Sequence, residues 1–200
     1  MYGTLVFGVG IYDIENVTNP KINLQGGESK YYMVWTSMLC RCYNEKSLKR
    51  CPTYKDCSVC DDWLRYSVFV AWMEAQDWKD KQLDKDIRVP NNKCYSPETC
   101  VFVTKEINLL FKDNSRNTYP MGVSLNWSDK KYLARVYCNG VKKYLGLFES
   151  VQEARDAYVV AKAEIIKYET YRVTGPQSEL VKDGLMKHIA ILLADHSKNK

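Results

Sequence analysis

The chain has 200 residues, which is enough for one large domain or two small ones, and we expect two with smaller additions at each end. Hydrophobic residues make up 46% and charged residues 26%, as in ordinary folded proteins, and no apolar run approaches the ~18 residues of a membrane helix. The net charge of +5 and the pI of 8.7 suit a nucleic-acid partner rather than a membrane.

The first residues of the chain lack the basic region of a signal peptide. We therefore expect a cytoplasmic protein whose eight cysteines stay reduced. Residues 1–28 alternate weakly between apolar and polar side chains and predict an N-terminal strand or extension.

Residues 29–111 form the next expected unit. Two stretches show helical apolar spacing, and they are separated by a loop that carries Lys46, Lys49 and Arg50. The apolar positions of the first stretch are Tyr31, Val34, Trp35, Met38, Leu39 and Cys42, and those of the second are Trp63, Phe69, Trp72 and Met73.

Four motifs follow one another in this unit: Arg41-Cys42-Tyr43, the Cys57-to-Trp63 stretch, Leu83-Asp84-Lys85-Asp86 and Tyr95-Ser96-Pro97-Glu98-Thr99-Cys100. In this order they resemble the phage HNH-type, homing-like endonucleases. That resemblance implies a ββα unit, a divalent metal such as Mg²⁺ or Mn²⁺, cleavage or nicking of double-stranded DNA, and a phage protein acting in the host cytoplasm.

An HNH site needs a carboxylate and an Asn or His on one metal ion, and a His that deprotonates the attacking water. Asp84 matches the carboxylate, but Lys85 stands where the family has its His, and Thr99 stands where it has its Asn. A Lys with its usual pKa near ~10.4 is charged at neutral pH and cannot accept a proton. It can contact a phosphate as a point charge instead.

A rebuilt site remains open. Its catalytic candidates are Asp84, Lys85 and Asp86, and its metal ligands are Asp84, Asp86 and an amide oxygen of Asn92 or Asn91. The alternative is that Asp84-Lys85-Asp86 is an alternating charged strand edge or a turn. The chain's two histidines, His188 and His196, lie far away in the C-terminal tail.

Cysteine spacing offers a separate hypothesis. Cys57 and Cys60 form a CxxC pair, and Cys40 and Cys42 form a CxC pair upstream, so these four thiolates are candidates for a structural zinc ion. The alternative is that they are small buried hydrophobic residues.

A polar segment, 112–118, predicts a linker. After it, the alternating runs 121–127, 132–137 and 143–148 are separated by turn signals at 127–130 and at Asn139-Gly140, which predicts a three-stranded antiparallel sheet. Ser150 and Glu153 form a capping-box pattern that begins a helix. The expected apolar face of this helix consists of Val151, Ala154, Tyr158, Ala161, Ile165 and Tyr168.

The predicted sheet is basic, with six Lys or Arg against one Asp between Arg116 and Leu147. Gly122-Val123, Tyr132–Val136, Lys143–Phe148 and Glu153–Tyr158 resemble the plant ethylene-response-factor DNA-binding domain and its phage relatives. That family reads the major groove with side chains of its sheet, and the matching positions here are Ser124, Asn126, Arg135, Tyr137, Lys142 and Tyr144. Lys130, Lys131 and Lys143 complete the expected DNA-binding set; the alternative is a solvated basic face.

A break at Thr174-Gly175-Pro176 precedes an amphipathic helix in 176–200, which we expect to pack on the core rather than bind a partner. The fold class is therefore α+β: an HNH-like unit (29–111), a sheet backed by one helix (116–173), and a C-terminal helix. The expected function is DNA binding, either with metal-dependent cleavage or as a non-catalytic regulator or inhibitor of a host nucleic-acid system. A third hypothesis is a protein-interaction role, in which the aromatic central unit or the C-terminal helix binds a partner protein, for example one of the host.

Overall fold

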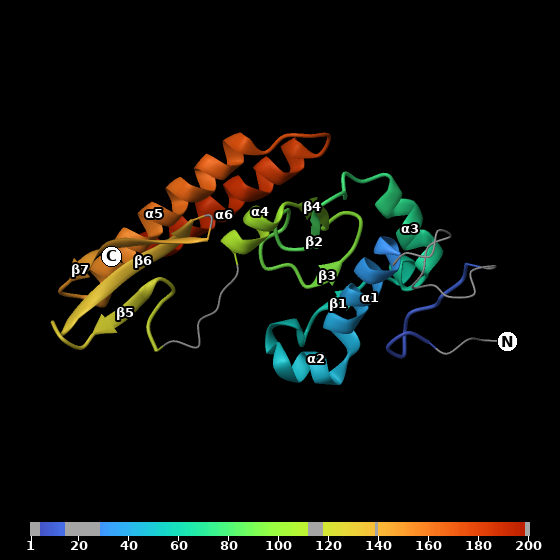
Figure 1. Cartoon of the computed structure of the whole chain (residues 1–200), viewed down its shortest axis with the longest axis horizontal. Helices are drawn as coiled ribbons and strands as arrows, with labels where there is room; N and C mark the ends of the chain where they lie inside the picture. Colours follow the sequence, from blue (N-terminus) through green and yellow to red (C-terminus); the bar gives the residue numbers. More distant parts are fainter. Residues whose placement is uncertain (1–4, 15–28, 112–117, 139, 199–200) are drawn as a thin grey trace. The chain divides into compact units, whose positions relative to one another are not determined.

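The computed structural model describes residues 5–14, 29–111, 118–138 and 140–198, and its contacts divide the chain into two compact units, 1–102 and 103–200 (Figure 1). Helices and strands are mixed, as expected for an α+β protein. The segment 112–117 of the predicted linker and Asn139 of the predicted hairpin turn lie outside the described residues.

The first unit is mainly helical. It contains α1 (Lys30–Tyr43), α2 (Glu45–Arg50), α3 (Tyr66–Glu74) and two short 3₁₀ helices, η1 (Pro52–Tyr54) and η2 (Asp61–Leu64). Helix α2 replaces the loop expected around Lys46, because the Asn44 side chain accepts a hydrogen bond from the Ser47 amide and caps it. Strands β1 (Ser58–Val59) and β3 (Cys94–Tyr95) are parallel, and β2 (Gln82–Asp84) pairs with β4 (Val101–Val103).

The N-terminal segment differs from the expected strand. Over residues 5–14 it forms a tight turn between Val6 and Gly10, and Ile11 makes a single parallel bridge to Arg65. The reason lies in Asp13, whose carboxylate accepts hydrogen bonds from the Ser67 amide (2.8 Å) and hydroxyl (2.7 Å). The segment thereby caps α3, although it lies far from the helix in sequence. The Asp13 carboxylate accepts from an amide of the first turn, which the N-cap residue Arg65 does not bind with its side chain.

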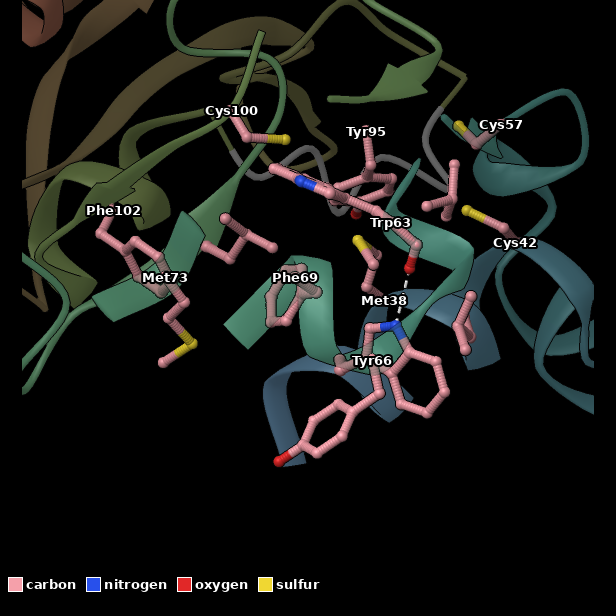
Figure 2. Close-up of a cluster of buried hydrophobic side chains, with 14 residues drawn as sticks. Met38, Cys42, Cys57, Trp63, Tyr66, Phe69, Met73, Tyr95, Cys100 and Phe102 are labelled. Carbon is pink, nitrogen blue, oxygen red and sulfur yellow. Dashed lines mark hydrogen bonds between the residues drawn. The ribbon is translucent and has the colours of Figure 1, made fainter. Parts of the chain in front are cut away.

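Aromatic side chains fill the core of the first unit (Figure 2). Trp35 and Trp63 are fully buried, and the Trp35 indole Nε1 donates a 2.7 Å hydrogen bond to the Trp63 carbonyl. Phe69 stands edge-on to Trp63 with ring centroids 5.2 Å apart. These contacts join α1, η2 and α3, so the two apolar helical stretches predicted from the sequence are confirmed as one packed core.

The second unit contains α4 (Lys105–Leu110), then the antiparallel sheet β5 (Val123–Asn126), β6 (Lys131–Cys138) and β7 (Val141–Phe148), followed by α5 (Val151–Arg172) and α6 (Ser178–Lys198). Helix α5 packs on one face of the sheet, and α6 runs beside α5 (Figure 1). The predicted three-stranded sheet, its backing helix and the C-terminal helix are all confirmed.

The start of α5 has the predicted cap. Ser150 Oγ accepts from the Glu153 amide, and Glu153 Oε2 accepts from the Ser150 amide. Gly122 fits this packing because its φ is +83° and any Cβ there would overlap the Tyr158 ring.

The buried face of α5 is broader than predicted. Ala154 and Tyr158 are buried as expected, but Tyr168 is 56% exposed, whereas Lys162 and Glu169 are buried. The physical reason is α6, which covers a second stripe of α5 that a single amphipathic pattern does not reveal. Burial also lowers the pKa of Lys162.

Candidate nucleic-acid interface

The sheet of the second unit has a covered face and an open face. Val123, Ala134 and Val136 are buried on the side of α5. Because side chains alternate along a strand and directly paired residues share a face, the register assigns the opposite side to a second set. This outward face consists of Ser124, Asn126, Lys131, Leu133, Arg135, Tyr137, Lys142, Tyr144 and Leu147.

A β-bulge between Ala134 and Arg135 decides which residues of β7 belong to this face. Ala134 pairs with Gly146, but Arg135 pairs with Tyr144, so Leu145 is the extra residue and packs on the α5 side. Without the bulge, Tyr144 and Lys142 would point toward α5. All six positions matched to the ethylene-response-factor pattern therefore share one face.

Arg135 lies in the central strand of the outward face opposite Tyr144, and Lys142 lies diagonally across from it on β7, opposite Tyr137. Within the described part of the chain, neither side chain forms an ion pair with a carboxylate. Tyr137 and Tyr144 flank them and are 57% and 58% exposed. The Lys142 ammonium lies 5.8 Å from the centre of the Tyr137 ring, a cation–π contact that holds the charge on this face.

The other expected contact residues are placed less simply. Lys131 shares the outward face, but its ammonium lies 2.6 Å from a Glu149 carboxylate oxygen. The Asn126 amide is engaged in the adjacent turn, donating to Asp129 and accepting from the Ser128 amide. Lys143 pairs with Val136 and so belongs to the α5 side of the sheet, where it stays exposed.

Two residues of the turn between β5 and β6 extend this edge of the sheet. Lys130 has a positive φ of 53°, within the turn predicted at 127–130. Trp127 is 82% exposed, more than any other large hydrophobic residue described here. The sequence places Trp127 in a predicted turn and gives it no binding role. A tryptophan in an otherwise polar tetrapeptide is the sequence feature that indicates its exposure.

The second candidate region lies in the first unit, where Asp84 ends β2. One of its carboxylate oxygens accepts hydrogen bonds from the amides of Asp86 (2.7 Å) and Ile87 (2.8 Å). This is the turn arrangement in which an Asp side chain replaces a backbone acceptor. Burial raises the pKa of Asp84 despite these two hydrogen bonds.

Lys85 points into the protein and is only 5% exposed. Its ammonium donates to both carboxylate oxygens of Asp86, at 2.7 and 2.8 Å, and to the Asn92 carbonyl at 2.6 Å. The Lys85 ammonium lies 5.9 Å from the centre of the Tyr54 ring and 6.0 Å from that of the Tyr95 ring, at the limit of a cation–π contact. Burial by itself lowers the pKa of Lys85, but the hydrogen bond to Asp86 and the charge interactions with Asp86, Cys57 and Tyr54 together outweigh it, so the pKa is raised. Lys85 is therefore an internal cation, not a proton acceptor.

The remaining candidates of this region support the loop. The Asn92 side chain donates to the carbonyls of Lys85 and Cys94 and accepts from the Cys94 amide. Thr99 donates to the Cys94 carbonyl at 2.8 Å, while Asn91 is an exposed residue with a φ of +61°. The loop between β2 and β4 is thus held by its own polar side chains.

Asp84, Asp86 and Asn92 do not fit a divalent cation in this arrangement. Asp84 binds two backbone amides, the Asn92 amide binds the backbone on both sides, and a lysine ammonium lies against Asp86. A bound metal needs oxygen atoms directed at one open point, and here a positive charge already lies among them. Over the described ranges no three His, Cys, Asp or Glu side chains are grouped as a metal site.

The four candidate zinc ligands belong to the first unit's core region. Cys42 and Cys57 are buried and lie at the same end of the aromatic cluster (Figure 2), while Cys40 and Cys60 are partly exposed. Burial raises the pKa of the Cys42 thiol to about 12, which favours the neutral thiol over the thiolate that zinc binds. All eight cysteines are free thiols.

None of the helices in the described residues has both the length and the apolar character that crossing a bilayer demands. Comparison of the chain with protein-family models, curated proteins and solved structures found no match in any of the three. A function for this chain therefore has to be inferred from its own residues.

Proposed function

We propose that this protein binds double-stranded DNA through the outward face of the sheet β5-β6-β7. The observation that carries the proposal is that Arg135 and Lys142, diagonal neighbours on β6 and β7, share an open sheet face without a carboxylate partner in the described residues. Charges placed in this way are available to neutralise phosphates, and the release of counterions from DNA supplies most of the affinity.

The geometry of the sheet suits this partner. A narrow antiparallel ribbon fits a major groove that is about 12 Å wide, as a helix does. Arg135 presents a guanidinium that can bind a guanine edge or a phosphate with two hydrogen bonds. Tyr137 and Tyr144 add exposed hydroxyl groups on both sides of it, and such groups donate to phosphate oxygens.

Binding without cleavage is favoured by the loop that follows β2. Lys85 holds the carboxylate of Asp86, and one oxygen of the Asp84 carboxylate accepts from two backbone amides, so both groups have a structural task in the loop that competes with activating water. We therefore propose a DNA-binding protein in which the HNH-like segment has a structural role.

The test of binding is a fluorescence-anisotropy titration of a labelled duplex over 50 to 200 mM salt. Arg135→Ala with Lys142→Ala should weaken binding and reduce the slope of log K against log salt by about 2 units, if each side chain contacts one phosphate. The matched control is Lys182→Ala with Lys187→Ala, which removes the same charge from α6, where both lysines pair with acids. Equal slopes for the two double variants would refute the proposal.

Cleavage is tested with supercoiled plasmid in Mg²⁺ or Mn²⁺, comparing the unmodified protein with Asp84→Ala. We expect the plasmid to stay supercoiled with both proteins. Nicking that disappears in Asp84→Ala would show a catalytic role for the β2 loop and would overturn the structural role proposed for it.

A further inference from the structure

A second group of cations lies in the first unit, on helix α2. Lys46, Lys49 and Arg50 are separated by three and four residues, so they share one side of the helix. All three side chains are exposed, while Ser47 faces the interior. The helix therefore presents three cations to solvent, with the exposed Glu45 four residues before Lys49 as its one acid.

Two further lysines adjoin this helix. The 3₁₀ helix η1 follows α2 directly and ends next to Lys55, which is exposed. The ammonium of Lys93, which precedes β3, donates a 3.4 Å hydrogen bond to the Thr53 carbonyl within η1. Segments about forty residues apart are thus in contact next to α2, and we call the five cations of this neighbourhood the α2 basic surface: Lys46, Lys49, Arg50, Lys55 and Lys93.

The local charge of this region is high. Between Arg41 and Lys55 the chain has five Lys or Arg and one acid, Glu45. In the parts of the chain for which a structure is described, no residue of the α2 basic surface forms an ion pair. The sheet of the second unit is consequently not the only place where positive charge gathers.

Helix stability alone does not explain these cations. Lys49 and Arg50 lie in the last turn of α2, where a positive charge interacts favourably with the helix dipole. Lys46 lies in the first turn, where the same dipole disfavours it, and like charges three and four residues apart repel each other. A helix of six residues gains nothing from this repulsion unless a polyanion relieves it.

We propose that the α2 basic surface binds the phosphate backbone of DNA as a second contact, independent of base sequence. The inference rests on the DNA binding proposed for the sheet and extends it to the other unit. Phosphate is favoured over a lipid surface because Leu48 of this helix is half-buried, which leaves no exposed apolar side chain on α2 to enter a membrane.

Two contacts on one chain reinforce each other. Because the α2 basic surface and the sheet belong to one chain, DNA binding by either raises the local concentration of DNA around the other. Because the contact is made by long, flexible lysines to phosphates, it contributes affinity and salt dependence rather than sequence preference.

The test compares two triple variants in the same anisotropy titration. Lys46→Gln, Lys49→Gln and Arg50→Gln keep the helix propensity of α2 and remove three charges. Lys167→Gln, Lys182→Gln and Lys187→Gln remove three charges from α5 and α6, at two exposed positions and, for Lys182, a half-buried one. We expect the α2 variant to weaken binding at 100 mM salt at least about tenfold and to reduce the salt slope by about 2.7 units. The α5–α6 variant should change the slope by less than about one unit.

A second variant protects the test against a folding defect in α2. Lys55→Gln with Lys93→Gln leaves the helix intact and should still reduce the slope, by about 1.8 units. If both variants bind like the unmodified protein while Arg135→Ala with Lys142→Ala loses binding, the second contact is refuted and the sheet interface stands. If the unmodified protein binds no duplex at low salt, both proposals fall.

Discussion

The sheet β5-β6-β7 and the loop after β2 use the same kinds of side chain in opposite ways. On the sheet, Arg135 and Lys142 lie on an open face without a carboxylate partner in the described residues. In the loop, Lys85 is buried and donates to Asp86 and to the Asn92 carbonyl. Charged side chains without a partner within the protein can bind a ligand. Charged side chains that are hydrogen-bonded to each other stabilise the fold instead.

The largest effect that separates the two regions is expected from Lys85→Met. Methionine keeps most of the buried apolar stem of Lys85 but removes the ammonium, so the hydrogen bonds to Asp86 and to the Asn92 carbonyl are lost. We expect a loss of about 2 kcal/mol in the free energy of unfolding, measured by urea denaturation.

The matched control is Lys81→Met, because Lys81 pairs with Asp77 four residues earlier on a more exposed site. Removing that pair should cost about 0.5 kcal/mol. If the two variants were equally stable, the hydrogen bonds of Lys85 would not contribute to stability more than an ordinary surface ion pair does.

A smaller effect is expected from the pH dependence of Asp84→Asn. Burial raises the pKa of Asp84 in the folded state, so the fold is favoured while the carboxyl is protonated and loses that contribution as the pH rises through the folded pKa. Asparagine keeps the acceptor oxygen of the turn but does not titrate. The stability of the unmodified protein relative to the variant should therefore fall between pH 3 and pH 7. A relative stability that rises over this range would contradict the raised pKa.

The smallest effect concerns Lys131, a cation of the outward face that forms an ion pair with Glu149. Glu149→Gln removes its partner without touching the capping box of α5, because that box uses Ser150 and Glu153. A freed Lys131 should tighten duplex binding about two- to threefold and steepen the salt slope by up to about 0.9. Glu164→Gln, an equal charge change at an exposed position of α5, serves as the control and should leave the slope unchanged.

Much of the second unit was predictable because its signals are local. The turn at 127–130 and the cap at Ser150 depend on residues close together in sequence, and the structure has both. The bulge opposite Arg135 was not predictable, since it arises from the pairing of two strands. Nor was the burial of Lys162 and Glu169, which follows from α6 lying against α5.

Less of the first unit could be predicted, because several of its contacts join residues that are distant in sequence. The aromatic spacing of Trp35, Trp63 and Phe69 predicted a helical core, and they do form one. Asp13, by contrast, caps α3 although it lies more than fifty residues before the helix, and no local sequence motif predicts that contact. The hydrogen bond of Lys85 to the Asn92 carbonyl likewise depends on the folded loop, which also positions Lys85 against Asp86, so neither contact could be predicted from the sequence.

The sequence by itself determined the sheet β5-β6-β7, the two helices that follow it and the positive charge of that sheet, because propensity, caps and turns act over a few residues. The tertiary structure alone decided which charges are free and which are bound. That outcome depends on strand register, on helix packing and on burial, all of which join residues that are distant along the chain. Arg135 and Lys85 are both single cations in the sequence, and only the fold sets one on an open face and encloses the other.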